Sequence, residues 1–350
     1  MKEPLRKLVI GASYGLLTAA KLAASGQPVS VVGFPDEVAR IWSHGVRIGF
    51  ADGLVLVPPM GYAGIRLVTP EEVDVAEHDL VFLAVQEPQV GTAAMAGLLR
   101  RIGDRLPVAA LMNMPPPPFL ERVPGLPQGI GRGAYRDAAV WAGLPAARMT
   151  LASPDAQALR LDPDKPGRLT VTLASNLRFA PFARADDQAL LQQVTRAASR
   201  VKSPSGFYPV QFVTRSSVFA PLAKWPMLAV GNCRCVGTGQ SALRSIRDAV
   251  WDDVRLSRRL YDGVTAGLLA CGAPPTALVP FESYAKAAEQ LVRPSSLARA
   301  LAHGATAVER IDLLVLNLLR DTGQNAEICN LMQSVCDTIA TMLISNEKRS

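Results

Sequence analysis

The sequence predicts an α/β protein, in which a parallel-sheet domain over residues 1–212 is followed by a mostly α-helical domain over residues 213–350. The chain has 350 residues, about twice the length of an ordinary domain. Up to residue 112, short apolar strands alternate with helical segments, which is typical of β-α-β units. From Ser216 onward the apolar residues recur at helical spacing.

Short apolar stretches between glycine-containing or polar segments mark the strands of the first domain. The run Pro115–Pro118 has no backbone donors, so we expect a stiff extended loop there, at the end of the strand-helix alternation. The later strand and helix of this domain are expected at its edge. The predicted strands are Leu8–Ile10, Val29–Val32, Leu54–Val57, Leu80–Val85, Val108–Met112 and Gly167–Leu173, and the predicted helices are Leu16–Ala24 and Asp187–Val201.

The second domain is predicted from amphipathic helical segments. The apolar stripe Ile311–Leu319 fits a homodimer interface or a core helix equally well, so the sequence leaves both open. The predicted helical segments are Ala242–Ala270, Tyr284–Leu291, Ser296–Ala302 and Ala307–Leu319.

Composition excludes several classes of protein. The hydrophobic share is 49% and the charged share 19%, and no apolar run approaches the ~18 residues of a membrane span, so neither a disordered nor a membrane-spanning protein is expected. The net charge of +7 supports a mild attraction for anionic ligands but no nucleic-acid partner. Five cysteines are too few for a disulfide framework, so we expect a cytoplasmic protein. The basic and apolar N-terminus resembles a secretion signal, but it continues into a second strand, and we expect it to stay in the fold.

A glycine turn follows the first predicted strand. It reads Gly11-Ala12-Ser13-Tyr14-Gly15 and leads into a helix, where unpaired backbone amides and the helix dipole favour an anion. Compared with the G-x-G-x-x-G pattern of Rossmann-type domains, it carries Ser13 at the middle glycine and is one residue shorter. These five residues are the candidate cofactor-binding turn. A turn without any ligand is the alternative that the sequence leaves open.

The same residues also spell G-x-S-x-G, the nucleophile elbow of α/β-hydrolases, with Ser13 as nucleophile. That interpretation is rejected, because an elbow follows several strands and this turn follows the first one. Only His44, His78 and His303 could serve as its base.

Six later segments occur in an informative order: Val29–Gly33, His44–Ile48, Asp79–Val85, Gly167–Leu169, Lys224–Asn232 and Arg293–Leu297. Together with the turn, they resemble the ketopantoate reductase family over most of the chain. The resemblance implies a Rossmann-type domain followed by a helical domain of the 6-phosphogluconate-dehydrogenase-like group. It also implies reduction of 2-dehydropantoate with NADPH.

The resemblance assigns roles within the second domain. Lys224 matches the family's general acid, which protonates the ketone oxygen as hydride arrives. Asn232 matches the second of two substrate-binding asparagines, and Leu228 replaces the first. Without the family order, Lys224 would be interpreted as a surface charge lying over Trp225.

Other matches have simple structural alternatives. Ser296 matches a substrate-binding serine, although a helix N-cap is the better single explanation. Asn113 matches an asparagine near nicotinamide and substrate, or is a turn residue. Gln89 matches a family glutamine at the cofactor site. The acidic partner is Glu309, with Asp312 second; both are expected on one helix, and a solvated charge explains each equally well.

The residues after the second strand do not indicate whether the cofactor is NAD or NADP. An NADP site places an arginine after the second strand and an NAD site an acid, but here Gly33–Pro35 stand there. Asp36 and Glu37 follow, and Arg40 lies close enough to reach a phosphate. NADPH is therefore implied by the resemblance alone, and NAD is not excluded.

Two replacements make the expected pocket less polar than ketopantoate requires. Gln86 stands where the family has a lysine, and Leu228 where it has an asparagine. We therefore expect a bulkier or more apolar carbonyl or imine substrate. Cys233 and Cys235 lack further ligands nearby, so no metal is expected.

The sequence thus predicts an NAD(P)H-dependent reductase of a small 2-keto acid or related carbonyl compound, with Lys224 acting in a cleft between the two domains. An imine reductase resembling opine dehydrogenases is the nearest alternative. A nucleotide-binding sensor that has lost its chemistry is the second.

Overall fold

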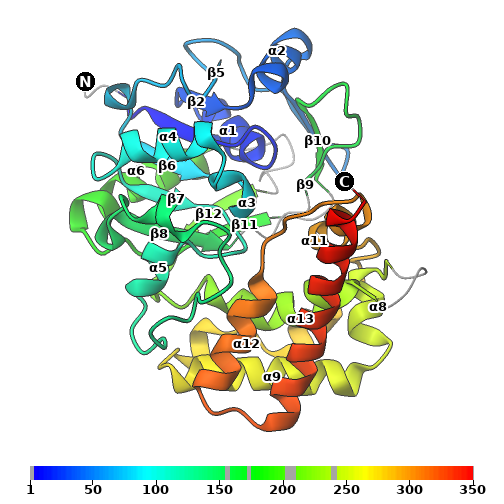
Figure 1. Ribbon diagram of the computed structural model, residues 1–350. Coiled ribbons are helices and arrows are strands. Elements are labelled where there is room, and N and C mark those ends of the chain that lie inside the picture. The colour runs from blue at the N-terminus through cyan, green and yellow to red at the C-terminus, as the bar shows by residue number, and fades with distance from the viewer. Residues whose placement is uncertain (1–3, 154–157, 172–174, 202–209, 238–242, 350) are drawn as a thin grey trace. The chain divides into compact units, whose positions relative to one another are not determined.

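The computed structural model describes residues 4–153, 158–171, 175–201, 210–237 and 243–349, which form two compact units (Figure 1). The first unit comprises residues 1–122 and 137–221, and the second residues 123–136 and 222–350. The grouping of residues 123–136 with the second unit has no counterpart in the sequence analysis. The domain boundary between residues 212 and 213 stays a prediction, whereas the α/β class is confirmed.

A mostly parallel sheet forms the centre of the first unit. Among the described residues it has eight strands in the order β12-β11-β8-β7-β6-β1-β2-β5, and only the β11–β8 pair is antiparallel. Every residue of β1 and β6 is buried, as expected for parallel strands covered on both faces. The strands are β1 Lys7–Ile10, β2 Val29–Val32, β5 Ile65–Val68, β6 Leu80–Leu83, β7 Val108–Ala110, β8 Met149–Ser153, β11 Ser175–Phe179 and β12 Val210–Thr214.

Helices cover this sheet. The apolar side of α1 packs on β1, β2 and β5, and α6 packs on β12 and α1. The helices are α1 Gly15–Ala24, α2 Pro35–His44, α3 Glu87–Val90, α4 Ala93–Ile102, α5 Pro117–Glu121 and α6 Ala185–Ser199, with 3₁₀ turns at Val75–Glu77, Ala138–Trp141 and Ala146–Arg148.

A second, smaller sheet belongs to the same unit. Its order is β4-β3-β10-β9, and β10 pairs in parallel with β3 although more than a hundred residues separate them in sequence. The sequence analysis predicted β4 and β10 as strands but not this separate sheet, and the predicted residues 172–173 lie outside the described residues. The strands are β3 Arg47–Phe50, β4 Val55–Leu56, β9 Ala158–Leu159 and β10 Arg168–Val171.

The proline run does not stay extended over its whole length, so that prediction was partly wrong. Pro117 and Pro118 form the first turn of α5, which continues to Glu121. A helix needs no amide donors in its first turn, and the fixed φ of proline suits that position. Prolines, which lack an amide donor, therefore suit the start of a helix as well as an extended loop.

The second unit is helical. The predicted segment Ser296–Ala302 is confirmed residue for residue, and the segment predicted as Ala242–Ala270 divides into two helices, with residue 242 outside the described residues. Its helices are α7 Trp225–Met227, α8 Ile246–Trp251, α9 Val254–Ala270, α10 Phe281–Ala288, α11 Ser296–Ala302, α12 Ile311–Asp321 and α13 Ala326–Glu347, with a π-helical turn at Leu228–Asn232 and 3₁₀ turns at Leu222–Lys224, Cys233–Cys235 and Pro275–Ala277.

The longest helix, α13, was missed by the sequence analysis. It packs against α12, α9 and α11, and Asn346 donates to the Leu301 carbonyl at 2.8 Å near its C-terminal end. By length and composition alone, its 22 residues would also suffice to cross a membrane, contrary to the sequence analysis. Ile328, Met332 and Ile339 on one face are buried among the helices of this unit.

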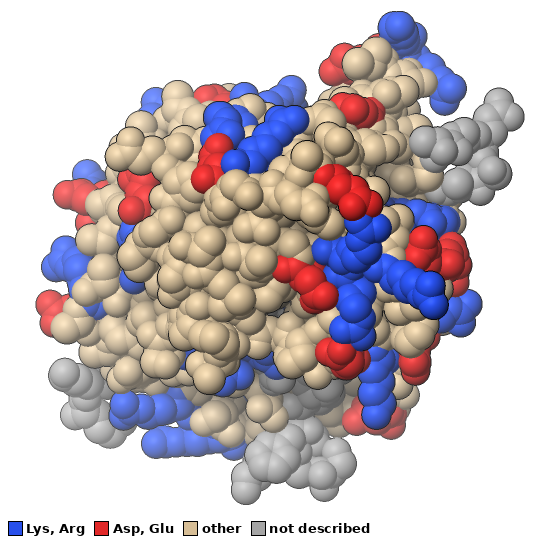
Figure 2. All heavy atoms as spheres, turned by 90° about the horizontal axis from the view of Figure 1, so that it is seen from below, with Lys and Arg blue, Asp and Glu red and all other residues tan. Residues whose placement is uncertain are grey.

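Charges of both signs alternate on the surface. Figure 2 shows Lys and Arg beside Asp and Glu along part of the face that it draws, next to a broad area with few charges. Ion pairs of the second unit include Arg258–Glu282 at 2.6 Å and Arg244–Asp252 at 3.5 Å. The net charge of +7 is thus not collected into one basic surface on the face shown.

A buried histidine makes the stability of the first unit depend on pH. His78 Nδ1 lies 2.8 Å from the Asp74 carbonyl, which only accepts, so Nδ1 carries the proton and Nε2 accepts from the Ser30 hydroxyl at 3.0 Å. Burial lowers the pKa of His78 from its ordinary value of 6.5. The unfolded chain therefore binds a proton first, and we expect the free energy of unfolding to fall below about pH 6.5, by at most about 1.4 kcal/mol per pH unit.

Urea unfolding of the wild type and of His78→Gln, at neutral pH and about one unit below the ordinary histidine pKa, measures this effect. The wild type should lose more stability on acidification than H78Q. The exposed His44 provides the matched control, since H44Q should keep the wild-type pH dependence. A parallel loss in wild type and H78Q would show that another group titrates.

Candidate active site

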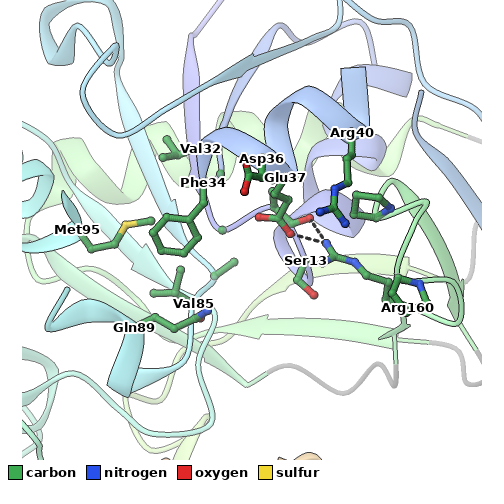
Figure 3. Close-up of a pocket in the computed structure, with 16 residues that line it drawn as sticks. Ser13, Val32, Phe34, Asp36, Glu37, Arg40, Val85, Gln89, Met95 and Arg160 are labelled. Carbon is green, nitrogen blue, oxygen red and sulfur yellow. Dashed lines mark hydrogen bonds and ion pairs between the residues drawn. The ribbon is translucent and has the colours of Figure 1, made fainter. Parts of the chain in front are cut away.

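A pocket of about 430 Å³ lies in the first unit where the strand order reverses. β2 lies on one side of β1 and β6 on the other, and ligands of open parallel sheets bind at the carboxyl ends of strands at such a point. Figure 3 shows an apolar side and a charged side of the pocket. The apolar side is formed by Phe34, Val85 and Met95, and the charged side by Asp36, Glu37, Arg40 and Arg160.

The predicted glycine turn forms the floor of this pocket, and its two glycines are required by close packing. Gly11 has a φ of +111°, and a Cβ there would lie 2.4 Å from the Ala84 carbonyl oxygen. A Cβ on Gly15 would lie 2.7 Å from Val9 Cγ1. The Gly11 amide also donates to the Val32 carbonyl at 2.9 Å, which fixes the turn to the end of β2.

The start of α1 is available to an anion. No side chain caps it, as is also true of α2, α4, α5 and α6 in the same unit. The Leu16 and Leu17 amides already donate to the Ser13 and Tyr14 carbonyls at 3.1 Å, so the attraction for an anion comes from the helix dipole, which favours negative charge at this end. Ser13 is exposed beside these amides. The glycine floor, the uncapped helix and the position at the strand reversal together fit the diphosphate of a dinucleotide.

Arg160 was missed by the sequence analysis. It follows β9, and its Nη2 donates to the Ala12 carbonyl at 2.9 Å and to Glu37 Oε1 at 2.7 Å. Its Nε is buried and has no hydrogen-bond partner among the described residues. No local pattern pointed to Arg160, because it reaches the turn only through the pairing of β10 with β3.

Gln89, which the resemblance places at the cofactor site, lines this pocket. It stands in the first turn of α3, where its Oε1 accepts from the Gln86 amide at 3.0 Å as part of a capping box. Asn113 follows β7 and is half-buried, but it does not line the pocket. In the structure, Gln89 therefore lines the same pocket as the glycine turn, whereas Asn113 does not.

In the second unit, Lys224 and Asn232 lie on one face of a helical segment. Between Pro221 and Val236, every residue is buried except Lys224, Met227 and Asn232. Met227 follows Lys224 by three residues, and Asn232 follows Met227 by five. The spacing of five arises because Leu228–Asn232 forms a π-helical turn, a feature frequent at functional sites. Leu228 is 4% exposed, so Met227 and not Leu228 shares this face.

Outside donors hold the π-helical turn. The Tyr284 hydroxyl donates to the Met227 carbonyl at 3.1 Å, and the Ser295 hydroxyl donates to the Asn232 carbonyl at 2.8 Å. A Cβ on Gly231 would lie 2.0 Å from the Tyr284 hydroxyl, so only glycine leaves room for it. Burial raises the pKa of Tyr284, which keeps the hydroxyl protonated as a donor.

The N-cap expected at Ser296 lies one residue earlier. Ser295 caps α11 by accepting from the Ala298 amide at 3.1 Å, while Ser296 is the first helical residue and is exposed. Because Ser295 also bonds to Asn232, the start of α11 lies beside Asn232. The two predicted substrate residues, Asn232 and Ser296, thus come from adjacent segments.

The placement of Glu309 and Asp312 on one helix was wrong. α12 begins at Ile311, so Glu309 precedes it and is half-buried, with partners of its own. Asp312 is 0% exposed and is not a solvated charge: Arg310 Nη2 donates to its Oδ2 at 2.7 Å and Nε to its Oδ1 at 3.0 Å. Burial, and then the Asp312 charge, raise the pKa of Cys336. Asp312 is therefore part of a buried ion pair.

Cysteine positions do not indicate a metal centre in the described residues. No three His, Cys, Asp or Glu side chains lie together as ligands there. Cys233 and Cys235 are buried, and Cys235 Sγ donates to the Gly231 carbonyl at 2.9 Å, so this pair belongs to the packing of the π-helical turn.

Comparison with known proteins shows the fold. No protein-family model and no curated protein matches the sequence. D-mandelate dehydrogenase, solved with NADH and anilino(oxo)acetate, has a TM-score of 0.69 at 12% identity, covering 98% of this chain and 100% of that chain. A PanE/ApbA-family ketopantoate reductase from Ralstonia eutropha has a TM-score of 0.69 at 16% identity, with the same coverage of 98% and 100%. A ketopantoate reductase from Staphylococcus aureus, described as dimeric, has a TM-score of 0.64 at 12% identity and covers 98% and 100%.

The resemblance found in the sequence is therefore confirmed at the level of the fold, over nearly the whole chain. This fold consists of an α/β unit with a mostly parallel sheet and a helical unit.

Proposed function

We propose that this protein is a reductase that uses a nicotinamide dinucleotide to reduce a small 2-keto acid or a related carbonyl compound. The observation that carries the proposal is the closely packed glycine turn that leads into α1 at the reversal of strand order. The shared fold supports it, because D-mandelate dehydrogenase was solved with NADH.

The cofactor, when bound, supplies the hydride. The turn Gly11–Gly15 and the positive end of the α1 dipole would hold its diphosphate, and Gln89 lines the same pocket. Lys224 donates a proton to the substrate oxygen on which negative charge develops. Asn232 and Ser296 bind the substrate by hydrogen bonds.

Two further residues have assigned roles in this proposal. Glu309 is the acidic residue of the site, because Asp312 is buried against Arg310. Asn113 keeps the substrate-binding role that the resemblance implies.

The substrate class follows from the face that carries Lys224. Met227 lies between Lys224 and Asn232 on that face, where a polar residue would suit a hydroxylated acid such as ketopantoate. The apolar side chain favours a 2-keto acid with an apolar substituent. D-mandelate dehydrogenase, with the same fold, was solved with the aromatic compound anilino(oxo)acetate.

Three finer assignments stay predictions. The resemblance implies NADPH, while a protein of the same fold was solved with NADH. A homodimer is supported by the dimeric ketopantoate reductase of Staphylococcus aureus, whereas the apolar residues of α12 are buried within this chain and belong to its core. A cytoplasmic location rests on cysteine usage alone.

Steady-state turnover with a panel of 2-keto acids and each reduced cofactor tests the proposal. We expect keto acids with apolar side chains to be reduced faster than ketopantoate, and added amino acids to leave the rate unchanged. A rate that requires an amino acid together with the keto acid would identify an imine reductase. Cofactor binding with no turnover across the panel would identify a sensor protein.

A further inference from the structure

The end of β2 has no room for a side chain of its own. A Cβ on Gly33 would lie 2.9 Å from Ala12 Cβ and 3.2 Å from Glu37 Oε2. The space that a side chain at the end of this strand would fill is therefore taken by the carboxylate of Glu37. Glu37 stands in the first turn of α2 and points back towards the strand (Figure 3).

Arg160 fixes this carboxylate in place. The same Nη2 bonds to Glu37 Oε1 at 2.7 Å and to the Ala12 carbonyl at 2.9 Å, so the guanidinium links Glu37 to the glycine turn. The side chains of Arg160 and Glu37 are only 26% and 21% exposed, which limits screening of the pair by solvent. Oε2 accepts no hydrogen bond from the described residues, so it remains available to a ligand in the pocket.

A carboxylate at this position distinguishes the two nicotinamide cofactors. In Rossmann-type sites, an acid at the end of the second strand accepts a hydrogen bond from the ribose 2′-hydroxyl of NAD, whereas NADP carries a phosphate there. A phosphate would meet the charge of Glu37 at short range, which is unfavourable.

The arginines nearby do not offset this repulsion. Arg160 is neutralised by Glu37, and Arg40 and Asp36, which stand four residues apart on α2 and both line the pocket, carry opposite charges. The four charged residues of the pocket therefore sum to zero, and they leave no surplus positive charge for a phosphate.

We propose that Glu37 selects the cofactor by accepting a hydrogen bond from the ribose 2′-hydroxyl, with Arg160 as the residue that positions it, so that this chain prefers NADH to NADPH. The inference rests on the proposed function, because it requires a nicotinamide dinucleotide in this pocket. It departs from the NADPH that the sequence resemblance implies.

Separate fluorescence titrations with NADH and NADPH test the inference by binding alone, without turnover. For the wild type, we expect NADH to bind roughly 10- to 100-fold more tightly, as for a hydrogen bond to a charged group. Glu37→Gln keeps the size of the side chain and removes its charge, so the preference should fall to about threefold or less.

Matched variants separate position from net charge. Glu71→Gln makes the same change at an exposed residue of the same unit outside the pocket, and it should keep the wild-type preference. Arg160→Gln should lower the preference for NADH because Glu37 is no longer held. Arg160→Lys keeps the positive charge and should keep most of the preference for NADH. A difference between R160K and R160Q would show that this charge positions Glu37.

The outcomes are distinct. Equal or tighter binding of NADPH by the wild type would overturn the inference and leave the proposed function standing. Equal changes in E37Q and E71Q would show a net-charge effect and would overturn the role of Glu37, and unchanged preference in R160Q would overturn the role of Arg160. Binding of neither cofactor would overturn both the inference and the proposed function.

Discussion

Replacing Lys224 by alanine is expected to lower kcat by about 100- to 10,000-fold while leaving the affinity for NADH nearly unchanged. In the proposed function the ammonium group acts on the substrate oxygen as negative charge develops, so its loss should affect the transition state more than the ground state. The glycine turn that we propose as the cofactor site belongs to the other unit and keeps its own contacts. Steady-state kinetics with the best keto acid, together with cofactor titration, measures both quantities.

Lys286→Ala is the matched control, because Lys286 is an exposed lysine of α10 in the same unit. It should keep wild-type kcat. Activity that survives K224A at the level of K286A would contradict the assignment of Lys224. A matching loss of cofactor affinity in K224A would instead indicate that Lys224 serves binding and not proton transfer.

Replacing Arg310 by methionine is expected to lower the free energy of unfolding by about 3–5 kcal/mol. The change leaves the carboxylate of Asp312, which is 0% exposed, without the guanidinium that donates to both of its oxygens. Burying a charged carboxylate costs free energy, and the Arg310 cation offsets that cost in the wild type. Methionine keeps much of the side-chain volume but does not offset the cost. Urea unfolding followed by circular dichroism gives the free energy.

The surface pair Arg258–Glu282 provides the control. Its side chains are 47% and 66% exposed, so Arg258→Met should cost about 1 kcal/mol or less. The double variant R310M/D312L removes both charges and should recover much of the stability lost in R310M. An R310M variant as stable as R258M would show that Asp312 is satisfied by other groups.

Local patterns predicted the part of the fold that forms the pocket floor. Apolar runs separated by glycines indicate a β-α-β unit, and the structure has β1, α1 and β2 within one residue of the predicted bounds. Gly11 and Gly15 were identified because a tight turn before a helix needs residues without side chains. Each of these signals lies within about thirty residues of sequence.

Features that depend on distant contacts were not predictable in the same way. Arg160 reaches the Ala12 carbonyl through the pairing of β10 with β3. The spacing of apolar residues in the sequence does not indicate which strands pair. The helix α13 was missed because its face towards the other helices and its outward face both carry apolar residues, which weakens helical periodicity.

Offsets of one or two residues also changed the interpretation of the second unit. Ser295 and Ser296 are equivalent as N-caps in sequence, and the structure distinguishes them because Ser295 accepts from the Ala298 amide and also donates to the Asn232 carbonyl. The resemblance aligned Leu228 with a substrate-binding asparagine, but Leu228 is 4% exposed and Met227 shares the face of Lys224.

A crystal structure of the protein with NADH tests the central claim most directly. The account predicts density for the diphosphate at the first amides of α1, over Gly11 and beside Ser13, with the adenosine ribose next to Glu37. A dinucleotide bound elsewhere, with this turn in contact with protein atoms alone, would contradict it.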